Sequence, residues 1–149
     1  MVNSRKCDVL IVEDNPSDAF LIELGLGKDR PESISIRKVA DGEEALNFLY
    51  NREQHIDAPR PAVVLLDLNL PKVDGRDVLR AIKGDPDLSR IPVVIFSTSE
   101  SPHDVAASYQ YGANSYIVKP KDLDDTLRII SLCRTYWLEV VRLETAERG

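Results

Sequence analysis

Residues 9–16 read VLIVEDNP, and they contain the parts of a strand–turn–helix unit. Four consecutive apolar residues rich in Val, Ile and Leu are typical of a strand buried on both faces of a parallel sheet. Asn15 is a favourable N-cap residue, and Pro16 suits the first helical position, where a missing N–H does no harm. The segment therefore predicts a buried strand that ends at Val12 and a helix that begins at Pro16.

Further apolar runs follow at residues 34–39, 62–66, 93–96 and 116–118. The run at 34–39 alternates and carries two charges, as expected of an edge strand with one wetter face. Amphipathic segments lie between the runs, and a polar connection over residues 51–61 is expected to form an exposed loop. Each of the five helix candidates begins with a capping residue that is followed three positions later by a carboxylate. These pairs are Asn15 with Asp18, Asp41 with Glu44, Asp74 with Asp77, Ser101 with Asp104, and Asp122 with Asp125. Five strands alternating with five helices predict an α/β fold with a doubly wound parallel sheet.

The composition indicates one globular domain. The chain has 149 residues, of which 43% are hydrophobic and 30% are charged. Acidic residues outnumber basic ones by 25 to 19, and the net charge of -6 disfavours binding to nucleic acid or to an anionic membrane. No apolar run approaches the roughly 20 residues of a membrane helix, and the N-terminus lacks a secretion signal, so we expect a cytoplasmic protein. Cys7 and Cys133 have no partners at metal-ligand spacing and are expected to be reduced packing residues.

Charged and hydroxyl side chains lie at the ends of the predicted strands. They are Glu13, Asp14, Asp67, Ser97, Thr98 and Lys119. In an open parallel sheet these strand ends meet at one edge, where ligands bind. Three acids placed together repel one another unless a cation intervenes, and hard carboxylate oxygens suit Mg²⁺ or Mn²⁺. A divalent ion beside Lys119 indicates phosphate chemistry, in which Asp67 would be the nucleophile that forms an aspartyl phosphate. Any one of these acids could merely cap a helix, but that explanation does not account for the whole set.

Short motifs in a fixed order surround these residues. They are residues 11–15 (IVEDN), 65–71 (LLDLNLP), 74–75 (DG), 94–97 (VIFS), 112–113 (GA) and 116–120 (YIVKP). Together the motifs resemble those of the receiver domains of two-component response regulators, and the resemblance runs from about Cys7 to about Cys133. It implies a flavodoxin-like sheet with strand order 2-1-3-4-5. It also implies a signalling protein, not an enzyme, that takes part in its own phosphorylation and dephosphorylation.

The resemblance implies roles for individual residues. Asp67 would accept phosphate from a histidine of a sensor kinase. The expected Mg²⁺ ligands are Glu13 (through water), Asp14, Asp67 and the backbone carbonyl of Asn69. Lys119 and Ser97 would contact the phosphoryl oxygens, and Tyr116 would be an aromatic switch that turns inward as Ser97 moves. The signal would then be carried by the surface that the fourth helix, fifth strand and fifth helix form.

The chain continues beyond the expected end of a receiver. An apolar stripe with helical spacing predicts that the last helix runs from about Leu123 past Leu143. Residues 134–149 would then be a helical extension of a single receiver domain that spans residues 1–149. The extension either folds back onto its own domain or packs against a second copy, and we favour a homodimer. The expected interface residues are Tyr136, Trp137, Val140 and Val141. The tail and the loop before the third strand also resemble single-domain regulators that partner bacterial phytochrome-type kinases.

Other functions are compatible with parts of this pattern. A magnesium-dependent phosphohydrolase could use an aspartyl phosphate, but residues 67–69 lack the second acid that haloacid-dehalogenase-type phosphatases use. A flavodoxin-like carrier needs a hydroxyl- and glycine-rich loop after the first strand, whereas residues 13–16 read EDNP here. The sequence also has no P-loop motif, which disfavours an NTPase. A pseudo-receiver would never take phosphate, and a labelling assay distinguishes it. The output could be contact with a histidine phosphotransfer protein, with a target enzyme or with the kinase itself.

Overall fold

The computed structural model describes residues 6–27 and 34–144 of the chain. Its strands and longer helices alternate as β1 (Cys7–Val12), α1 (Pro16–Gly25), β2 (Ile36–Val39), α2 (Gly42–Leu49), β3 (Pro61–Leu66), α3 (Gly75–Gly84), β4 (Val93–Ser97), α4 (Pro102–Gln110), β5 (Ser115–Val118) and α5 (Leu123–Arg134). All neighbouring strands are parallel, and their order in the sheet is β2-β1-β3-β4-β5. The predicted doubly wound fold and strand order are therefore confirmed. Within these ranges, no helix combines the length and the apolar character that a membrane span requires.

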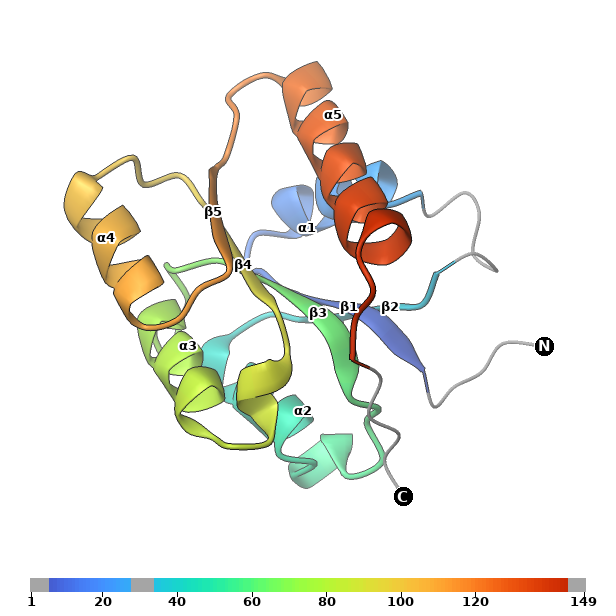
Figure 1. Cartoon of the computed structure of the whole chain (residues 1–149), viewed down its shortest axis with the longest axis vertical. Coiled ribbons are helices and arrows are strands. Elements are labelled where there is room, and N and C mark those ends of the chain that lie inside the picture. The colour runs from blue at the N-terminus through green and yellow to red at the C-terminus, as the bar shows by residue number, and fades with distance from the viewer. Residues whose placement is uncertain (1–5, 28–33, 145–149) are drawn as a thin grey trace.

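Helices cover both faces of the sheet. Figure 1 shows α1 and α5 together on one face and α2 and α3 on the other, with α4 beside β5. Leu10 and Val12 of β1 join the core that α2 and α3 cover, whereas Val9 and Ile11 join the core beneath α1 and α5. All four side chains are at most 3% exposed, and full burial of such a side chain contributes about 1.5–3 kcal/mol. Because β1 is held from both sides, the position of the residues that follow Val12 is fixed as well.

The predicted helix starts are confirmed by capping hydrogen bonds. In all five helices the cap side chain accepts a hydrogen bond from a backbone N–H of the first turn. The caps are Asn15, Asp41, Asp74, Ser101 and Asp122. The carboxylates three positions later behave differently, since Asp18 binds Lys119 and Asp104 binds Arg76. For these two acids the capping-box interpretation was wrong, because a cationic side chain within reach is a stronger partner than a backbone N–H.

Residues 51–61 are more ordered than the exposed loop that the sequence predicts. The segment contains a short 3₁₀ helix, and the side-chain amide of Asn51 donates to the carbonyl oxygens of His55 and Ala58 at 3.2 and 2.7 Å. Ala58 is only 7% exposed, whereas Ile56 is 69% exposed. The segment therefore packs in part against the domain and presents one large apolar side chain to solvent.

The C-terminal segment differs from the predicted long helix. The α-helix α5 ends at Arg134, a π-helical turn covers Thr135–Val140, and the backbone is extended at Val141. The prediction that the helix continues past Leu143 was therefore wrong. The last part of the predicted extension, residues 145–149, lies outside the described residues.

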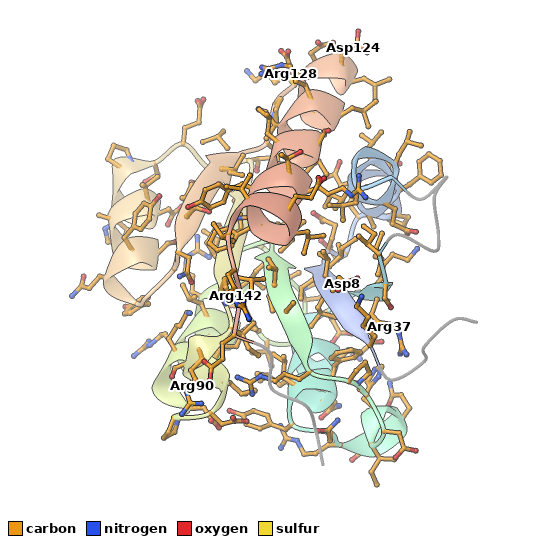
Figure 2. The ribbon with its side chains drawn as sticks, turned by 45° about the vertical axis from the view of Figure 1, so that its right-hand side comes forward. Asp8, Arg37, Arg90, Asp124, Arg128 and Arg142 are labelled. Atoms are coloured by element: carbon orange, nitrogen blue, oxygen red, sulfur yellow. The ribbon has the colours of Figure 1, made fainter. Side chains whose placement is uncertain are left out.

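The described part of this segment folds back onto its own domain. Trp137 and Leu143 pack against the core beneath α1 and α5, and Arg90 pairs with Glu144 at 3.0 Å. Figure 2 shows Arg142 on the stretch that leaves α5 and runs toward the short 3₁₀ helix that contains Arg90. The apolar stripe of the tail is thus covered in part by the core of the same chain.

Candidate functional site

The strand register brings the predicted site residues to one edge of the sheet. Val12 of β1 is paired with Leu66 of β3, so Glu13 and Asp67 follow neighbouring strands at the same level. The N–H of Asp67 donates to the carbonyl oxygen of Val12 at 3.1 Å, which extends the ladder by one residue. On the other side of β4, the N–H of Lys119 donates to the carbonyl oxygen of Ser97 at 2.7 Å.

Three carboxylates form an acidic cluster at this edge. One oxygen each from Glu13, Asp14 and Asp67 lies within 4.8 Å of the other two. Glu13 and Asp67 are only 5% and 6% exposed, whereas Asp14 is exposed and opens the cluster to solvent. Three hard anionic oxygens on a partly open site fit a divalent cation such as Mg²⁺ or Mn²⁺, which keeps several water ligands. Asn69 lies beside the cluster, since its N–H donates to Asp67 Oδ1 at 3.2 Å.

The ammonium group of Lys119 lies among three carboxylates. Its Nζ donates to Glu13 Oε1 at 2.6 Å, to Asp18 Oδ2 at 2.9 Å and to Asp67 Oδ2 at 3.1 Å. These bonds use all three donors of the ammonium group, and only 9% of the lysine side chain is exposed. Burial alone would lower the pKa of Lys119, but the hydrogen bonds to Glu13 and Asp18 and the charge of Asp67 outweigh it and raise that pKa. Lys119 is therefore a permanent cation at the edge of the acidic cluster.

The environment of Glu13 favours the protonated form of its carboxyl group. Burial raises the pKa of Glu13 to about 7, and the negative charge of Asp67 acts in the same direction. The hydrogen bonds from Lys119 and from the N–H of Asn15, whose distance to Glu13 Oε2 is 3.1 Å, act against this rise. A proton on Glu13 therefore relieves the repulsion within the cluster when no cation does so.

The predicted switch residues lie on the β4 side of the site. Ser97 is fully buried, and its Oγ accepts a hydrogen bond from the N–H of Ser99 at 3.2 Å. The hydroxyl of Tyr116 donates to the carbonyl oxygen of Ser99 at 2.9 Å. The backbone N–H of Tyr116 donates to the Tyr109 hydroxyl at 3.1 Å. The half-buried aromatic ring of β5 is thus joined to the loop that follows Ser97.

A second polar network joins this loop to α3, and the sequence did not predict it. Asp104 accepts hydrogen bonds from Ser99 Oγ at 2.6 Å and from Arg76 at 3.1 Å, and Arg76 also binds Asp74 at 3.1 and 3.2 Å. The Ser99 hydrogen bond is the largest of the contacts that lower the pKa of Asp104. Sequence spacing gives no signal for the contact between Arg76 and Asp104, because the two residues come from different helices.

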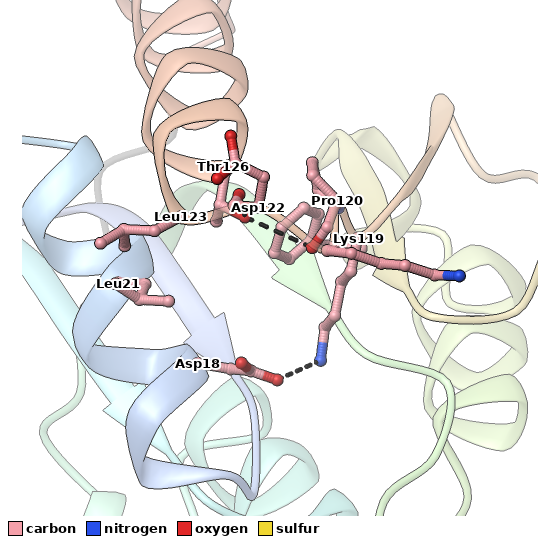
Figure 3. A pocket seen from close by; sticks show the side chains of 9 residues that line it. Asp18, Leu21, Lys119, Pro120, Asp122, Leu123 and Thr126 are labelled. Atoms are coloured by element: carbon pink, nitrogen blue, oxygen red, sulfur yellow. Dashed lines mark hydrogen bonds and ion pairs between the residues drawn. The ribbon is translucent and has the colours of Figure 1, made fainter.

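Asp18 is the other site residue that the sequence did not predict. It belongs to the first turn of α1, and the sequence assigned it to the capping box of Asn15. Figure 3 shows its carboxylate reaching from α1 to the Lys119 ammonium. A usable signal was present, because α1 begins at the edge of the sheet where Glu13 and Asp14 lie.

The predicted tail residues do not belong to this site. Tyr136 and Val140 are 51% and 66% exposed, whereas Trp137 and Val141 are half-buried. Trp137 packs against the core of its own chain, and the expected role of these four residues in a dimer interface stays a prediction.

Comparisons with known proteins identify relatives of this arrangement. The family model described as "Response regulator receiver domain" matches residues 9–131, a range that includes the acidic cluster and Lys119. Response regulator Rcp1 of Synechocystis sp. is 42% identical over 140 residues, which cover 93% of this chain and 93% of that protein. A crystal structure of the Mn²⁺-bound form of Rcp1 has a TM-score of 0.85 at 39% identity, over 94% of this chain and all of that one (100%). The phosphorylated cyanobacterial phytochrome response regulator RcpA has a TM-score of 0.87 at 39% identity, over 93% of this chain and 99% of that one.

The raised pKa of Glu13 predicts that Mg²⁺ affinity depends on pH. In the metal-free protein Glu13 holds a proton below about pH 7, and that proton must leave before the carboxylate can face a cation. Protons therefore compete with Mg²⁺ below this pH and not above it. We expect the dissociation constant for Mg²⁺, measured by calorimetry, to rise toward tenfold per pH unit below about pH 7 and to be nearly constant above it.

The matched control is Glu13→Gln, which should bind Mg²⁺ more weakly and lose most of this pH dependence. An affinity in the wild-type protein that is the same at about pH 6 and about pH 8 would contradict the assignment of Glu13.

Proposed function

The chain belongs to the response regulator receiver domain family, and we propose that Asp67 is the residue that accepts a phosphoryl group from a sensor histidine kinase. The observation that carries this proposal is the convergence of Lys119 and the acidic cluster on Asp67, with Lys119 Nζ at 3.1 Å from Asp67 Oδ2. In the transfer, an oxygen of Asp67 forms a bond to phosphorus as the bond from phosphorus to the kinase histidine breaks. The protein contributes mainly position and charge to such a step.

We propose Mg²⁺ as the cation of the acidic cluster. Asp14, Asp67 and the backbone carbonyl of Asn69 would hold it directly, and Glu13 would hold it through water. The three carboxylate oxygens within 4.8 Å of one another support this set, and the relative Rcp1 has a Mn²⁺-bound form. When bound, the ion neutralises charge on the transferring phosphoryl oxygens.

Lys119 and Ser97 are proposed to bind the phosphoryl oxygens after transfer. A phosphoryl group adds about two negative charges and strong acceptor oxygens, so movement of Ser97 toward it is favourable. Ser97 and Tyr116 both contact Ser99 through hydrogen bonds, at 3.2 and 2.9 Å. This shared contact supports a switch in which Ser97 and Tyr116 move together and alter the surface formed by α4, β5 and α5.

The partners are proposed from the relatives and from the exposed tail. Because RcpA is a phytochrome response regulator, we propose a phytochrome-type sensor kinase in the cytoplasm as the phosphate source, with a histidine phosphotransfer protein as a recipient. We also propose a homodimer in which Tyr136 and Val140, which are 51% and 66% exposed, face a second copy. Val141 would lie at the border of that interface, and Trp137 would support it from beneath.

The phosphoacceptor assignment predicts a specific loss of labelling. Acetyl phosphate with Mg²⁺ should add one phosphoryl group to the wild-type protein, detected by intact mass, and a chelator should prevent it. Asp67→Asn should remain unlabelled because an amide cannot act as the nucleophile. Asp57→Asn, which changes an exposed carboxylate on the 51–61 segment, should be labelled as the wild type is. Equal labelling of Asp67→Asn and the wild type would place the phosphoryl group elsewhere.

The dimer proposal predicts a change in sedimentation. We expect the wild-type chain to sediment as a dimer at tens of micromolar and the double variant Tyr136→Ser, Val140→Ser to sediment as a monomer, because two exposed apolar contacts are removed. Ile56→Ser serves as the control, since it removes an apolar side chain that is at least as exposed (69%) from the loop before β3. A monomeric wild type, or a double variant that remains dimeric, would refute this interface.

A further inference from the structure

We infer that Asp18 is a positioning residue, which holds the ammonium group of Lys119 in place for phosphoryl transfer to Asp67. This inference rests on the proposed phosphoacceptor role of Asp67. The carboxylate of Asp18 reaches Lys119 Nζ from the first turn of α1 at 2.9 Å (Figure 3). Asp18 thereby joins α1 to the residue that follows β5.

Asp18 is available for this contact because another residue performs its expected capping role. In a capping box, the acid at the third helical position would bind the N–H of the cap residue. Here the N–H of Asn15 donates instead to Glu13 Oε2 at 3.1 Å. The side chain of Asp18 is 34% exposed, whereas that of Lys119 is only 9% exposed, so the contact is made at the border between the buried site and solvent.

Asp18 differs from the other two partners of Lys119. Glu13 and Asp67 belong to the acidic cluster, whose oxygens lie within 4.8 Å of one another. A divalent cation in that cluster competes with Lys119 for both of them. Each also accepts a backbone hydrogen bond, Glu13 from Asn15 at 3.1 Å and Asp67 from Asn69 at 3.2 Å. Of the three partners, Asp18 is the one that lies outside the acidic cluster.

A lysine without Asp18 would keep only the partners that the reaction needs. Its ammonium would be held by Glu13 and Asp67 alone, the two carboxylates that also belong to the acidic cluster. With Asp18 present, the ammonium is held from the side of α1, so it stays within reach of the phosphoryl oxygens as the cation and the phosphoryl group take up the oxygens of Asp67. Asp18 thus raises the rate of the chemical step because it keeps the ammonium in position for the transfer.

A pure charge effect of Asp18 would have the opposite sign. Removal of one negative charge beside a transferring phosphoryl group would speed the reaction, because like charges repel. Loss of a positioning contact slows it. The direction of the rate change therefore distinguishes the two roles without a structure of the variant.

The test measures the initial rate of phosphorylation by acetyl phosphate at saturating Mg²⁺. We expect Asp18→Asn to lower this maximal rate by at least about fivefold, with a half-saturating Mg²⁺ concentration that changes by less than about threefold. Asp18→Ala should show the same loss, and Asp18→Glu should restore most of the rate because it keeps the carboxylate. Glu23→Gln is the matched control, since Glu23 lies on the same helix and pairs with Lys38 away from the site. This control should react at the wild-type rate.

The Lys119→Gln background separates positioning from other effects. If Asp18 acts through Lys119, Asp18→Asn should cause no further loss in that background. An unchanged or faster maximal rate in Asp18→Asn, an equal loss in Glu23→Gln, or a loss that persists with Lys119→Gln would each overturn the inference. A wild-type protein that takes no phosphate on Asp67 would overturn the proposed function as well, whereas normal wild-type labelling with an unaffected Asp18→Asn would overturn the inference alone.

Discussion

One buried ammonium group holds together carboxylates from three separate elements of the fold. Lys119 follows β5, and its three partners come from the end of β1, the first turn of α1 and the end of β3. A pair of opposite unit charges at 4 Å interacts by about 4 kcal/mol at an effective dielectric constant of 20, and like charges repel by as much. With Asp14 included, four carboxylates and one ammonium lie at this edge, and a second cation or a proton on Glu13 reduces the excess of negative charge. This imbalance explains why the arrangement suits a divalent ion.

Hydrogen bonds also connect this edge of the sheet to elements at the surface of the protein. The loop after β4 contacts Ser97, Tyr116 and Asp104 through the backbone and side chain of Ser99. Asp104 is in turn bound to Arg76 at the start of α3. A change at Ser97 therefore has contiguous contacts to β5, α4 and α3, and these contacts supply the physical connection that a two-state surface requires.

Sequence reasoning succeeded where a local pattern has one physical solution. Apolar runs such as residues 9–12, alternating with amphipathic segments, are typical of a covered parallel sheet, and parallel strands place their carboxyl ends together, so Glu13, Asp67 and Lys119 could be assigned to one site. It failed where a local pattern has several solutions. An acid three residues after Asn15 can bind the cap or a distant cation, and the sequence does not say which cation the fold brings near.

The tail shows the same limit. An apolar stripe with helical spacing indicates that this face is buried, but it does not indicate whether the face packs against the sheet of the same chain or against a second copy. Trp137 and Leu143 are covered by their own domain, whereas Tyr136 and Val140 are not. The π-helical turn at Thr135–Val140, which contains residues of both groups, has no marker such as glycine or proline in the sequence.

The central claim is that Lys119 and a divalent cation share the task of neutralising these carboxylates. The free energy of unfolding of Lys119→Gln, compared with the wild type in chelator and in saturating Mg²⁺ at about pH 8, tests it most directly, because Glu13 of the wild type is then ionised. The account predicts that the variant is less stable than the wild type in chelator, by about 3–5 kcal/mol at most. It also predicts that Mg²⁺ stabilises the variant more than it stabilises the wild type. A variant that equals the wild type in chelator, or that gains no more from Mg²⁺ than the wild type does, would contradict the account.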